Sequence, residues 1–279
     1  MAKLSVKAPL GAEHEESLRG RTQQTFFPAT QEENYTYPDS VEVNFKKRAE
    51  FDAAPMTATQ INERIRALMA EGNGHIVVHN PMAKHGIGVG LLNKLRLEFR
   101  GSLGYFGCGL LDGPYVTISG RVGWSCAENM LAGVIVIEKN AGSTFGAALR
   151  GGDLVCKGDV GARMAIDQKG GTIIVGGRCG SFCGFMMQRG RMIILGDTGN
   201  NLGDSMYDGT IYVGGKIGSL GVDAVPGELT EVEAAWLKRK LDTYGLKAPN
   251  GVENLKKIVA GRQLWNYDKL EPTEKKIAL

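Results

Sequence analysis

Residues 161–215 read GARMAIDQKGGTIIVGGRCGSFCGFMMQRGRMIILGDTGNNLGDSMYDGTIYVGG. Glycine returns in this stretch at a fixed interval of 19 residues, and the same phase continues on both sides of it. The positions in this phase are Gly104, Gly123, Gly142, Gly161, Gly180, Gly199 and Gly218. A constant period of this length indicates a structural unit that stacks on copies of itself, and it decides the fold before local propensities are considered.

Short apolar segments lie between the glycine positions. They are three to five residues long and rich in β-branched side chains, which favours strands over helices. The segments in register are Leu95–Phe99, Tyr115–Ile118, Val134–Ile137, Leu154–Cys156, Thr172–Val175, Met192–Leu195 and Thr210–Val213, and His75–Val78 is a further candidate.

A strand, a glycine corner, a second extended stretch and another corner fit within one period. The sequence therefore predicts an all-β fold, a parallel β-helix (solenoid) with 19-residue coils. Each strand would pair in parallel with its equivalents, at about 4.8 Å per coil. Glycine suits the corners because it accepts positive φ and lets successive backbones approach. A disordered, low-complexity segment would also be rich in glycine, but the regular apolar strands argue against it.

Composition limits the function classes. The chain has 279 residues and a net charge of +3, which gives no reason to expect nucleic acid or a membrane surface as a partner. No run of apolar residues is long enough for a transmembrane helix, and the N-terminus lacks the apolar core of a signal peptide. We therefore expect a cytoplasmic protein.

All five cysteines lie inside the repeat: Cys108, Cys126, Cys156, Cys179 and Cys183. Their odd number and the expected compartment favour free thiols over a disulfide framework. The Cys179–Cys183 pair has no further ligand at metal-binding spacing. Small buried core residues are the better interpretation.

Two helices are expected beside the solenoid. The first begins at Thr57, which is spaced with Gln60 as a capping box, and it ends near Gly72. The second begins at Thr230, with Glu233 as its capping-box partner. We expect the second helix to cap the open end of the solenoid, whose unpaired strand would otherwise promote aggregation.

These signals divide the chain into four parts. Residues 1–55 are predicted to be an extended N-terminal arm, 56–74 the leading helix, 75–227 the solenoid, and 228–279 the capping helix and C-terminal tail. The arm and the tail carry isolated aromatic residues, and two interpretations stay open for them: a segment that lies across a neighbouring subunit, or disorder. These residues are Phe26, Phe27, Tyr35, Tyr37, Trp265 and Tyr267.

Signals for catalysis are weak. Gly86–Gly90 has alternating glycines, but a dinucleotide site needs a helix after them, and none is expected here. His75, His79 and His85 are close in sequence; the strand-like residues between the first two favour structural histidines over metal ligands. Acidic residues in the glycine turns, such as Asp159, are expected to bond their own backbone. No catalytic, cofactor-binding or metal-binding residue is nominated.

The glycine pattern also carries a resemblance to a family. The stretch from Gly161 to Gly215, with GGTIIVGG and GSFCGFMMQRGRMIILGDTGNNLGDSMYDGTIYVGG, resembles the GXGXG domain of glutamate synthase large subunits. The resemblance covers roughly residues 57–225 and implies a right-handed β-helix. The same fold occurs in one of the subunits of formylmethanofuran dehydrogenases and of the related formyltransferase/hydrolase complex, so the fold alone leaves the reaction open.

Two other parts of a full glutamate synthase have no match. The N-terminal cysteine nucleophile of its glutaminase domain is absent, because residue 2 is Ala2, and so is its three-cysteine iron–sulfur motif. The resemblance therefore implies that these domains are separate chains. The tail, with GVDAVPGELTEVEAAWLKRKLDTYG and GRQLWNYDKLEP, is most similar to free-standing GXGXG subunits of N-methylglutamate synthases (methylamine–glutamate N-methyltransferases).

This resemblance implies a non-catalytic subunit with no cofactor of its own. It would brace a glutamine-amidotransferase-like subunit against an FMN- and iron–sulfur-containing subunit and help to enclose the passage for ammonia or amine. Two alternatives remain. One is a scaffold subunit of another glutamate synthase-like or formyl-transfer complex. The other is a self-sufficient enzyme that uses His79, His85 or the pair Cys179 and Cys183.

Overall fold

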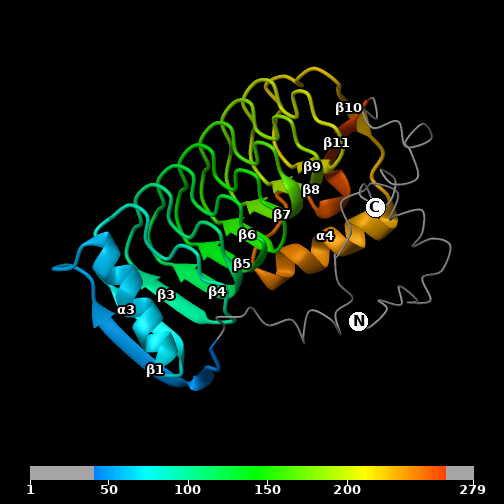
Figure 1. The fold of residues 1–279 in the computed structure, drawn as a ribbon. Coiled ribbons are helices and arrows are strands. Elements are labelled where there is room, and N and C mark those ends of the chain that lie inside the picture. Colours follow the sequence, from blue (N-terminus) through cyan, green and yellow to red (C-terminus); the bar gives the residue numbers. More distant parts are fainter. Residues whose placement is uncertain (1–40, 262–279) are drawn as a thin grey trace, which may run out of the picture.

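The apolar segments between the glycines form parallel strands, each stacked on the strand one coil earlier (Figure 1). The structure is a computed structural model and describes residues 41–261. Its elements are β1 (Asn44–Asp52), α3 (Ala58–Ala70), β2 (Asn73–His79), β3 (Arg96–Arg100), β4 (Asp112–Ile118), β5 (Ala132–Ile137), β6 (Asp153–Cys156), β7 (Lys169–Val175), β8 (Arg189–Ile194), β9 (Thr210–Val213), β10 (Ala224–Gly227), α4 (Glu231–Thr243), the 3-10 helix η1 (Val252–Asn254) and β11 (Lys256–Ala260).

The strands make one sheet along the side of the solenoid, in the order β1 to β9, then β11 and β10. Pairs from β1 to β9 are parallel, whereas β11 is antiparallel to both β9 and β10. From β4 to β9 the register advances by one period per coil, so that Val134 pairs with Asp153 and Asp153 with Thr172. The predicted solenoid is confirmed.

Side chains at equivalent positions of successive coils stack into ladders inside the solenoid. The ladder through Ile135, Leu154 and Ile173 is fully buried, as are its neighbours in the adjacent coils. A second line of parallel bridges on another side of the coil joins Val122, Ala141 and their equivalents through to Ile217. The core is therefore continuous from coil to coil, as expected for a solenoid.

The glycines serve two separate purposes, which the glycine period alone does not distinguish. At Gly180 φ is not positive, but a Cβ would lie 2.6 Å from the backbone nitrogen of Ala162 in the preceding coil. At Gly190, a later corner, φ is +100°. The glycines in the 19-residue phase are thus needed for close approach, and several of those at the following corner for their backbone conformation.

One turn of each coil has a conformation that the glycine pattern did not predict. In it alternate residues are left-handed, as at Arg163, Ala165 and Asp167, with φ near +57°. Such residues cost about 1 kcal/mol or more each unless the surroundings hold them. Here the backbone N–H groups of Arg163 and Asp167 donate to the next coil and that of Ala165 to the previous one, at 2.8–2.9 Å. In the first coil the three left-handed positions are glycines 86, 88 and 90.

Helix α3 covers the first coil. Its N-cap Thr57 and Gln60 form the predicted capping box, and Ile61 and Ile65 are fully buried in the solenoid core. The Asn62 side chain donates to the carbonyl of Gly86 and accepts from the N–H of Gly88, each at 2.8 Å. The helix therefore closes the N-terminal end of the core and satisfies backbone groups exposed there.

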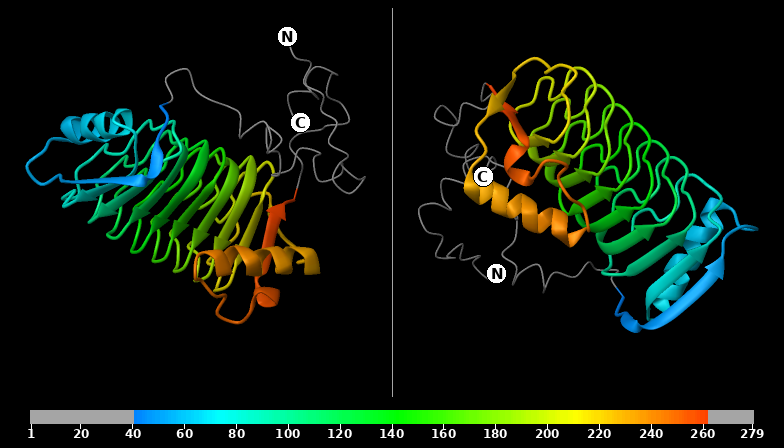
Figure 2. Two further views of the ribbon diagram at one scale, coloured as in Figure 1. Left: turned by 90° about the horizontal axis from the view of Figure 1, so that it is seen from below. Right: turned by 180° about the vertical axis from the view of Figure 1, so that it is seen from behind.

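Helix α4 does not cap the open end, contrary to expectation. It lies across the outer face of the sheet, as Figures 1 and 2 show, and its capping box of Thr230 and Glu233 is present. Leu237 and Leu241 pack there on Val155 and Ile174. The helix lies on this face because the outward residues of β5–β9 are largely apolar. The last parallel strand, β9, is covered instead by β11, which returns antiparallel to it.

The arm predicted for residues 1–55 is only in part described. Within it, residues 44–52 form strand β1, which pairs with β2 and extends the sheet by one strand. This strand precedes the glycine phase, so the repeat did not reveal it. Residues 1–40 and 262–279 lie outside the described residues, and so do the aromatic residues of the arm and tail. Across residues 41–261, no helix has the length and apolar character needed to cross a membrane.

Candidate docking surface

The thiols are buried among apolar side chains. Burial raises the pKa of Cys108 and of Cys156 to about 12, and that of Cys126 well above its usual range. A thiol with such a pKa stays protonated at neutral pH and is a poor nucleophile or metal ligand. These three cysteines are packing residues of the core.

Cys179 and Cys183 lie side by side in one coil but show no sign of reactivity. The hydrogen bond to Cys183 and burial both raise the pKa of Cys179. The Cys183 Sγ atom lies 3.3 Å from the carbonyl oxygen of Gly180 and donates to it. Both thiols are therefore satisfied within the core.

The histidines that were considered as ligands are held separately. His75 contacts Glu98 at 2.8 Å and His79 contacts Glu50 at 3.1 Å, both on the outer face of the first strands. The hydrogen bond from His79 and the nearby Arg48 lower the pKa of Glu50. Each histidine has its own partner, so the structure does not bring them together as a site.

Asp208 bonds its own turn as expected, since its Oδ1 atom accepts from the N–H of Gly209 at 2.7 Å. Two other acidic side chains in the turns bond the next coil instead. The Asp159 Oδ1 atom accepts from the N–H of Arg178 at 2.9 Å, and Asp197 Oδ1 accepts from Lys216 at 2.7 Å. Within residues 41–261 no group of three or more histidine, cysteine or acidic side chains is placed to hold a metal ion.

A row of stacked rings runs along the outside of the first coils. His85 stacks on Tyr105 with ring centroids 4.6 Å apart, and Tyr105 stacks on Trp124 at 5.1 Å. The three residues occupy equivalent positions of successive coils, and we call them the aromatic ladder. His85 Nδ1 accepts the backbone N–H of Tyr105 at 2.8 Å, which places the proton of a neutral ring on Nε2.

The phased glycines make room for these rings. A Cβ on Gly123 would lie 2.5 Å from the Tyr105 ring, and one on Gly142 would lie 2.6 Å from the Trp124 ring. Each ring thus lies against the backbone of the following coil. The next positions of the ladder are the small residues Ser143, Ala162 and Ser181, so the row of rings ends at Trp124.

The ladder is exposed in spite of its apolar character. Trp124 keeps 57% of its surface and Tyr105 40%. Phe106 and Leu110, in the same coil as Tyr105, are about half exposed as well. Large exposed aromatic groups on a rigid frame are typical of protein–protein interfaces, where Tyr and Trp contribute much of the binding energy. This part of the solenoid is the candidate docking surface.

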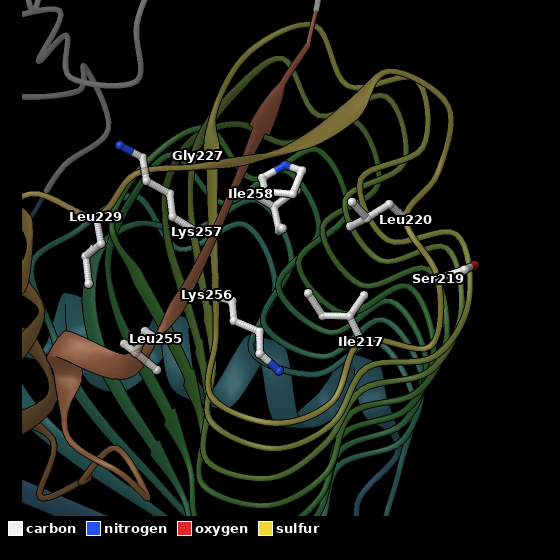
Figure 3. Close-up of a pocket in the computed structure, with 10 residues that line it drawn as sticks. Ile217, Ser219, Leu220, Gly227, Leu229, Leu255, Lys256, Lys257 and Ile258 are labelled. Carbon is white, nitrogen blue, oxygen red and sulfur yellow. The ribbon is translucent and has the colours of Figure 1, made fainter.

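A pocket of about 500 Å³ lies at the other end of the solenoid (Figure 3). Ile217 and Leu220 of the last coil line one side, and Gly227 and Ile258 of β10 and β11 line the other. Both lysines at its rim have partners: Lys256 Nζ donates to the carbonyl of Gly215 at 2.7 Å, and Lys257 pairs with Glu233 at 2.8 Å. The pocket is therefore a mainly apolar hollow whose lining has no unpaired cation.

The residues of the aromatic ladder were not predicted as a set from the sequence. The spacing of His85, Tyr105 and Trp124 is 20 and then 19 residues, and an aromatic residue recurring at the solenoid period is a signal that could have been found. The signal was obscured because the first spacing is one residue longer than the 19-residue period, so His85 falls out of phase with Tyr105 and Trp124.

Comparison with known proteins gives two findings. A family model described as the GXGXG motif matches residues 56–243, which is well over half of the chain. Protein GlxC of Rhizobium meliloti (strain 1021) is 40% identical over 60 residues. That match covers 22% of this chain and 26% of Protein GlxC, about a quarter of each.

Proposed function

The chain belongs to the GXGXG family, and from this membership we propose that it is the non-catalytic structural subunit of an N-methylglutamate synthase. The whole complex would convert L-glutamate and methylamine to N-methyl-L-glutamate and ammonia. This chain would brace a glutamine-amidotransferase-like subunit against a subunit that carries FMN and an iron–sulfur cluster. The family match and the exposed aromatic ladder on a rigid frame support the scaffold role. The choice of N-methylglutamate synthase rests on the resemblance of the tail to free-standing GXGXG subunits.

The solenoid has the stiffness that such a role requires. Coil-to-coil hydrogen bonds run along the left-handed turns, as from Arg163 to Ser181, and along the second line of bridges, as from Gly142 to Val122. The α4 helix adds a second layer, in which the Arg191 guanidinium lies 4.5 Å from the Trp236 ring centroid. A frame bonded in this way holds attached subunits at a constant separation better than loops would.

A fixed separation matters for the chemistry that we propose for the partners. Ammonia that passes between two active sites must stay neutral to act as a nucleophile, and bulk water would protonate and dilute it on the way. A rigid wall against which both catalytic subunits dock would keep the passage closed. The thiols of the frame suit this passive role because burial keeps Cys108 and Cys156 protonated.

Reconstitution with the partner chains tests the proposal. The complex purified through a tag on this chain is assayed with methylamine, with ammonia and with a formylated pterin as alternative substrates. We expect flavin absorbance and turnover with methylamine. Turnover with ammonia alone would overturn the assignment in favour of a glutamate synthase-like complex, and formyl transfer would overturn it in favour of a formyl-transfer complex.

The isolated chain provides the control. We expect it to be colourless and inactive. In the complex, replacing His79, Cys179 or Cys183 with alanine should change stability at most, whereas replacing His85, a member of the aromatic ladder, should weaken assembly. The turnover of correctly assembled complex should stay the same in all four variants. A loss of turnover in an assembled variant would contradict the non-catalytic role.

A further inference from the structure

Strand β1 is an edge strand of unusual length. It spans nine residues, with the sequence NFKKRAEFD, and it stands at the end of the sheet with β2 on one side. Within residues 41–261 no strand pairs with its other side. An edge of this kind presents backbone N–H and C=O groups to another strand, and proteins either protect it or use it for association.

The charges of β1 divide between its two halves. Lys46, Lys47 and Arg48 come first, and Glu50 and Asp52 follow. Lysines alone would repel a second edge strand, which is the usual protection. A basic half followed by an acidic half instead complements itself when two copies run antiparallel.

One antiparallel register satisfies these charges. If Ala49 faces Ala49 of a second copy across a two-fold axis, Arg48 faces the second copy's Glu50. Lys46 is not placed in this way, because the register of β1 with β2 shifts between Asn44 and Arg48. A shift of one residue in either direction about the axis would place Arg48 against Arg48 or Glu50 against Glu50. Opposite charges directly across a strand pair are favourable and like charges are unfavourable. The charges of β1 therefore favour the register centred on Ala49.

The charged side chains reach solvent at this edge, where Glu50 also contacts His79 at 3.1 Å. Arg48 and Glu50 lie 3.3 Å apart in the same strand, yet their side chains are 46% and 55% exposed. Helix α3 lies at the same end of the molecule, beside β1 (Figure 2). Its exposed side also carries both signs, as at Glu63 and Arg64, beside a shallow hollow that Pro55 and Ala67 help to line.

We propose that β1 pairs antiparallel with β1 of a second copy of this chain, so that two solenoids join end to end about a two-fold axis at Ala49. The partner sheets become one continuous sheet, which removes the exposed edge. This inference is independent of the reaction assigned to the complex, because it rests on β1 alone.

Charge reversal with rescue tests the pairing in solution. Sedimentation of the full chain over a wide concentration range should show a dimer. Arg48→Glu should raise the dissociation constant by about tenfold or more, since symmetry places two such pairs in each dimer. The double variant Arg48→Glu/Glu50→Arg should restore the dimer. Arg96→Glu, in the same outward row but on β3, is the matched control and should not change it.

A cysteine cross-link tests the register. Ala49→Cys should form an intermolecular disulfide under mild oxidation, because directly opposed residues lie close to the spacing that a disulfide spans. Phe45→Cys, exposed on the same strand, should not, and the five native thiols are buried. A monomer at every concentration, or a dimer that survives Arg48→Glu and gives no Ala49→Cys cross-link, would overturn the proposal.

Discussion

Glycine at the phased positions is a packing requirement. Around Gly180, an added methyl group would lie 2.6 Å from the nitrogen and 2.7 Å from the Cα of Ala162, both backbone atoms that cannot turn aside. The added methyl group would therefore force the two coils apart. This would lengthen the hydrogen bonds that the Gly180 N–H donates to the previous coil. The glycine period thus records how closely the backbones stack.

We predict that Gly180→Ala lowers the free energy of unfolding by about 2 kcal/mol or more, as overpacking in a rigid core does. Gly86→Ala is the matched control: nothing lies within 4 Å of its Cβ, so the cost should be about 1 kcal/mol from its φ of +62° alone. Denaturant unfolding of both variants measures the difference. Equal losses would contradict the close-approach argument.

Several residue-scale features lay beyond sequence reasoning. Arg163 and Ala165 have no local preference for the left-handed conformation; they adopt it because their N–H groups bond neighbouring coils. Gln168 occupies a fully buried position that is methionine or leucine in adjacent coils, and its Oε1 atom has no hydrogen-bond partner. Alignment of the coils would have located Gln168 in the core, but the contacts around it come only from the three-dimensional stack.

At the scale of elements, helix α4 is held by a small apolar contact and a set of polar ones. Leu237 is fully buried beneath it. Lys240 Nζ lies 2.7 Å from Asp153, and the Tyr212 hydroxyl donates to Glu233 at 2.9 Å. The helix is therefore coupled to strands β6 and β9 at separate points along its length.

We predict that Leu237→Ala destabilises the chain by about 2–5 kcal/mol, the usual range for a buried leucine. Val232→Ala on the same helix should change the stability by less than about 0.5 kcal/mol, because Val232 is almost fully exposed. Hydrogen exchange should show the loss of protection beginning in α4. A uniform loss of hydrogen-exchange protection across the sheet would contradict the view that the helix docks as a separate element.

The tyrosine contacts of α4 predict a dependence on alkaline pH. Burial and the nearby Glu233 raise the pKa of Tyr212, and burial and Asp153 raise that of Tyr244. The unfolded chain releases these protons at pH about 10, while the folded chain retains them. The folded state then binds more protons, so stability falls as pH rises above about 10.

The measurement is the thermal midpoint as a function of pH. Wild type should lose more stability than Tyr212→Phe as pH rises above about 10, since the variant keeps the ring and lacks the proton.

At acid pH the stability changes with pH in the opposite direction. Although burial raises it, the hydrogen bonds from Lys257, Thr230 and Tyr212 hold the pKa of Glu233 below its usual value, so stability should fall as pH drops through that range. Parallel alkaline curves for wild type and Tyr212→Phe would contradict the account.

The elements that the sequence predicted share a local signal. Capping boxes at Thr57 and Thr230 located both helices, and the period located the strands. Strand β1 was missed because it contains no glycine in phase. The position of α4 was predicted wrongly. The apolar stripe of the helix shows which of its sides is buried, but it does not show which surface that side packs on. The outward-facing apolar residues of the sheet, such as Val155 and Ile174, indicate that surface.

At the scale of the whole molecule, the exposed aromatic ladder is the feature that a free-standing rod does not need. Serine occupies the equivalent position in later coils, at Ser143 and Ser181, so the fold accepts a small residue there. We predict that Tyr105→Ser/Trp124→Ser leaves the β-sheet band of the far-ultraviolet circular dichroism spectrum in place. Binding to the catalytic subunits should weaken by about tenfold or more, the effect of losing interface aromatics.

The matched control for the ladder is Val222→Ser, an exposed apolar residue at the opposite end of the solenoid. It should bind the partners like wild type. Affinities can be measured by titration of labelled chain with each purified partner. Equal affinities for the ladder variant and the control would remove the aromatic ladder as the docking surface.

Native mass spectrometry of the complex purified through a tag on this chain tests the central claim most directly. Our account predicts assemblies that contain this solenoid together with a flavin-bearing chain and an amidotransferase-like chain. Recovery of the solenoid without either chain, from cells that express both, would contradict its role as the frame that joins them.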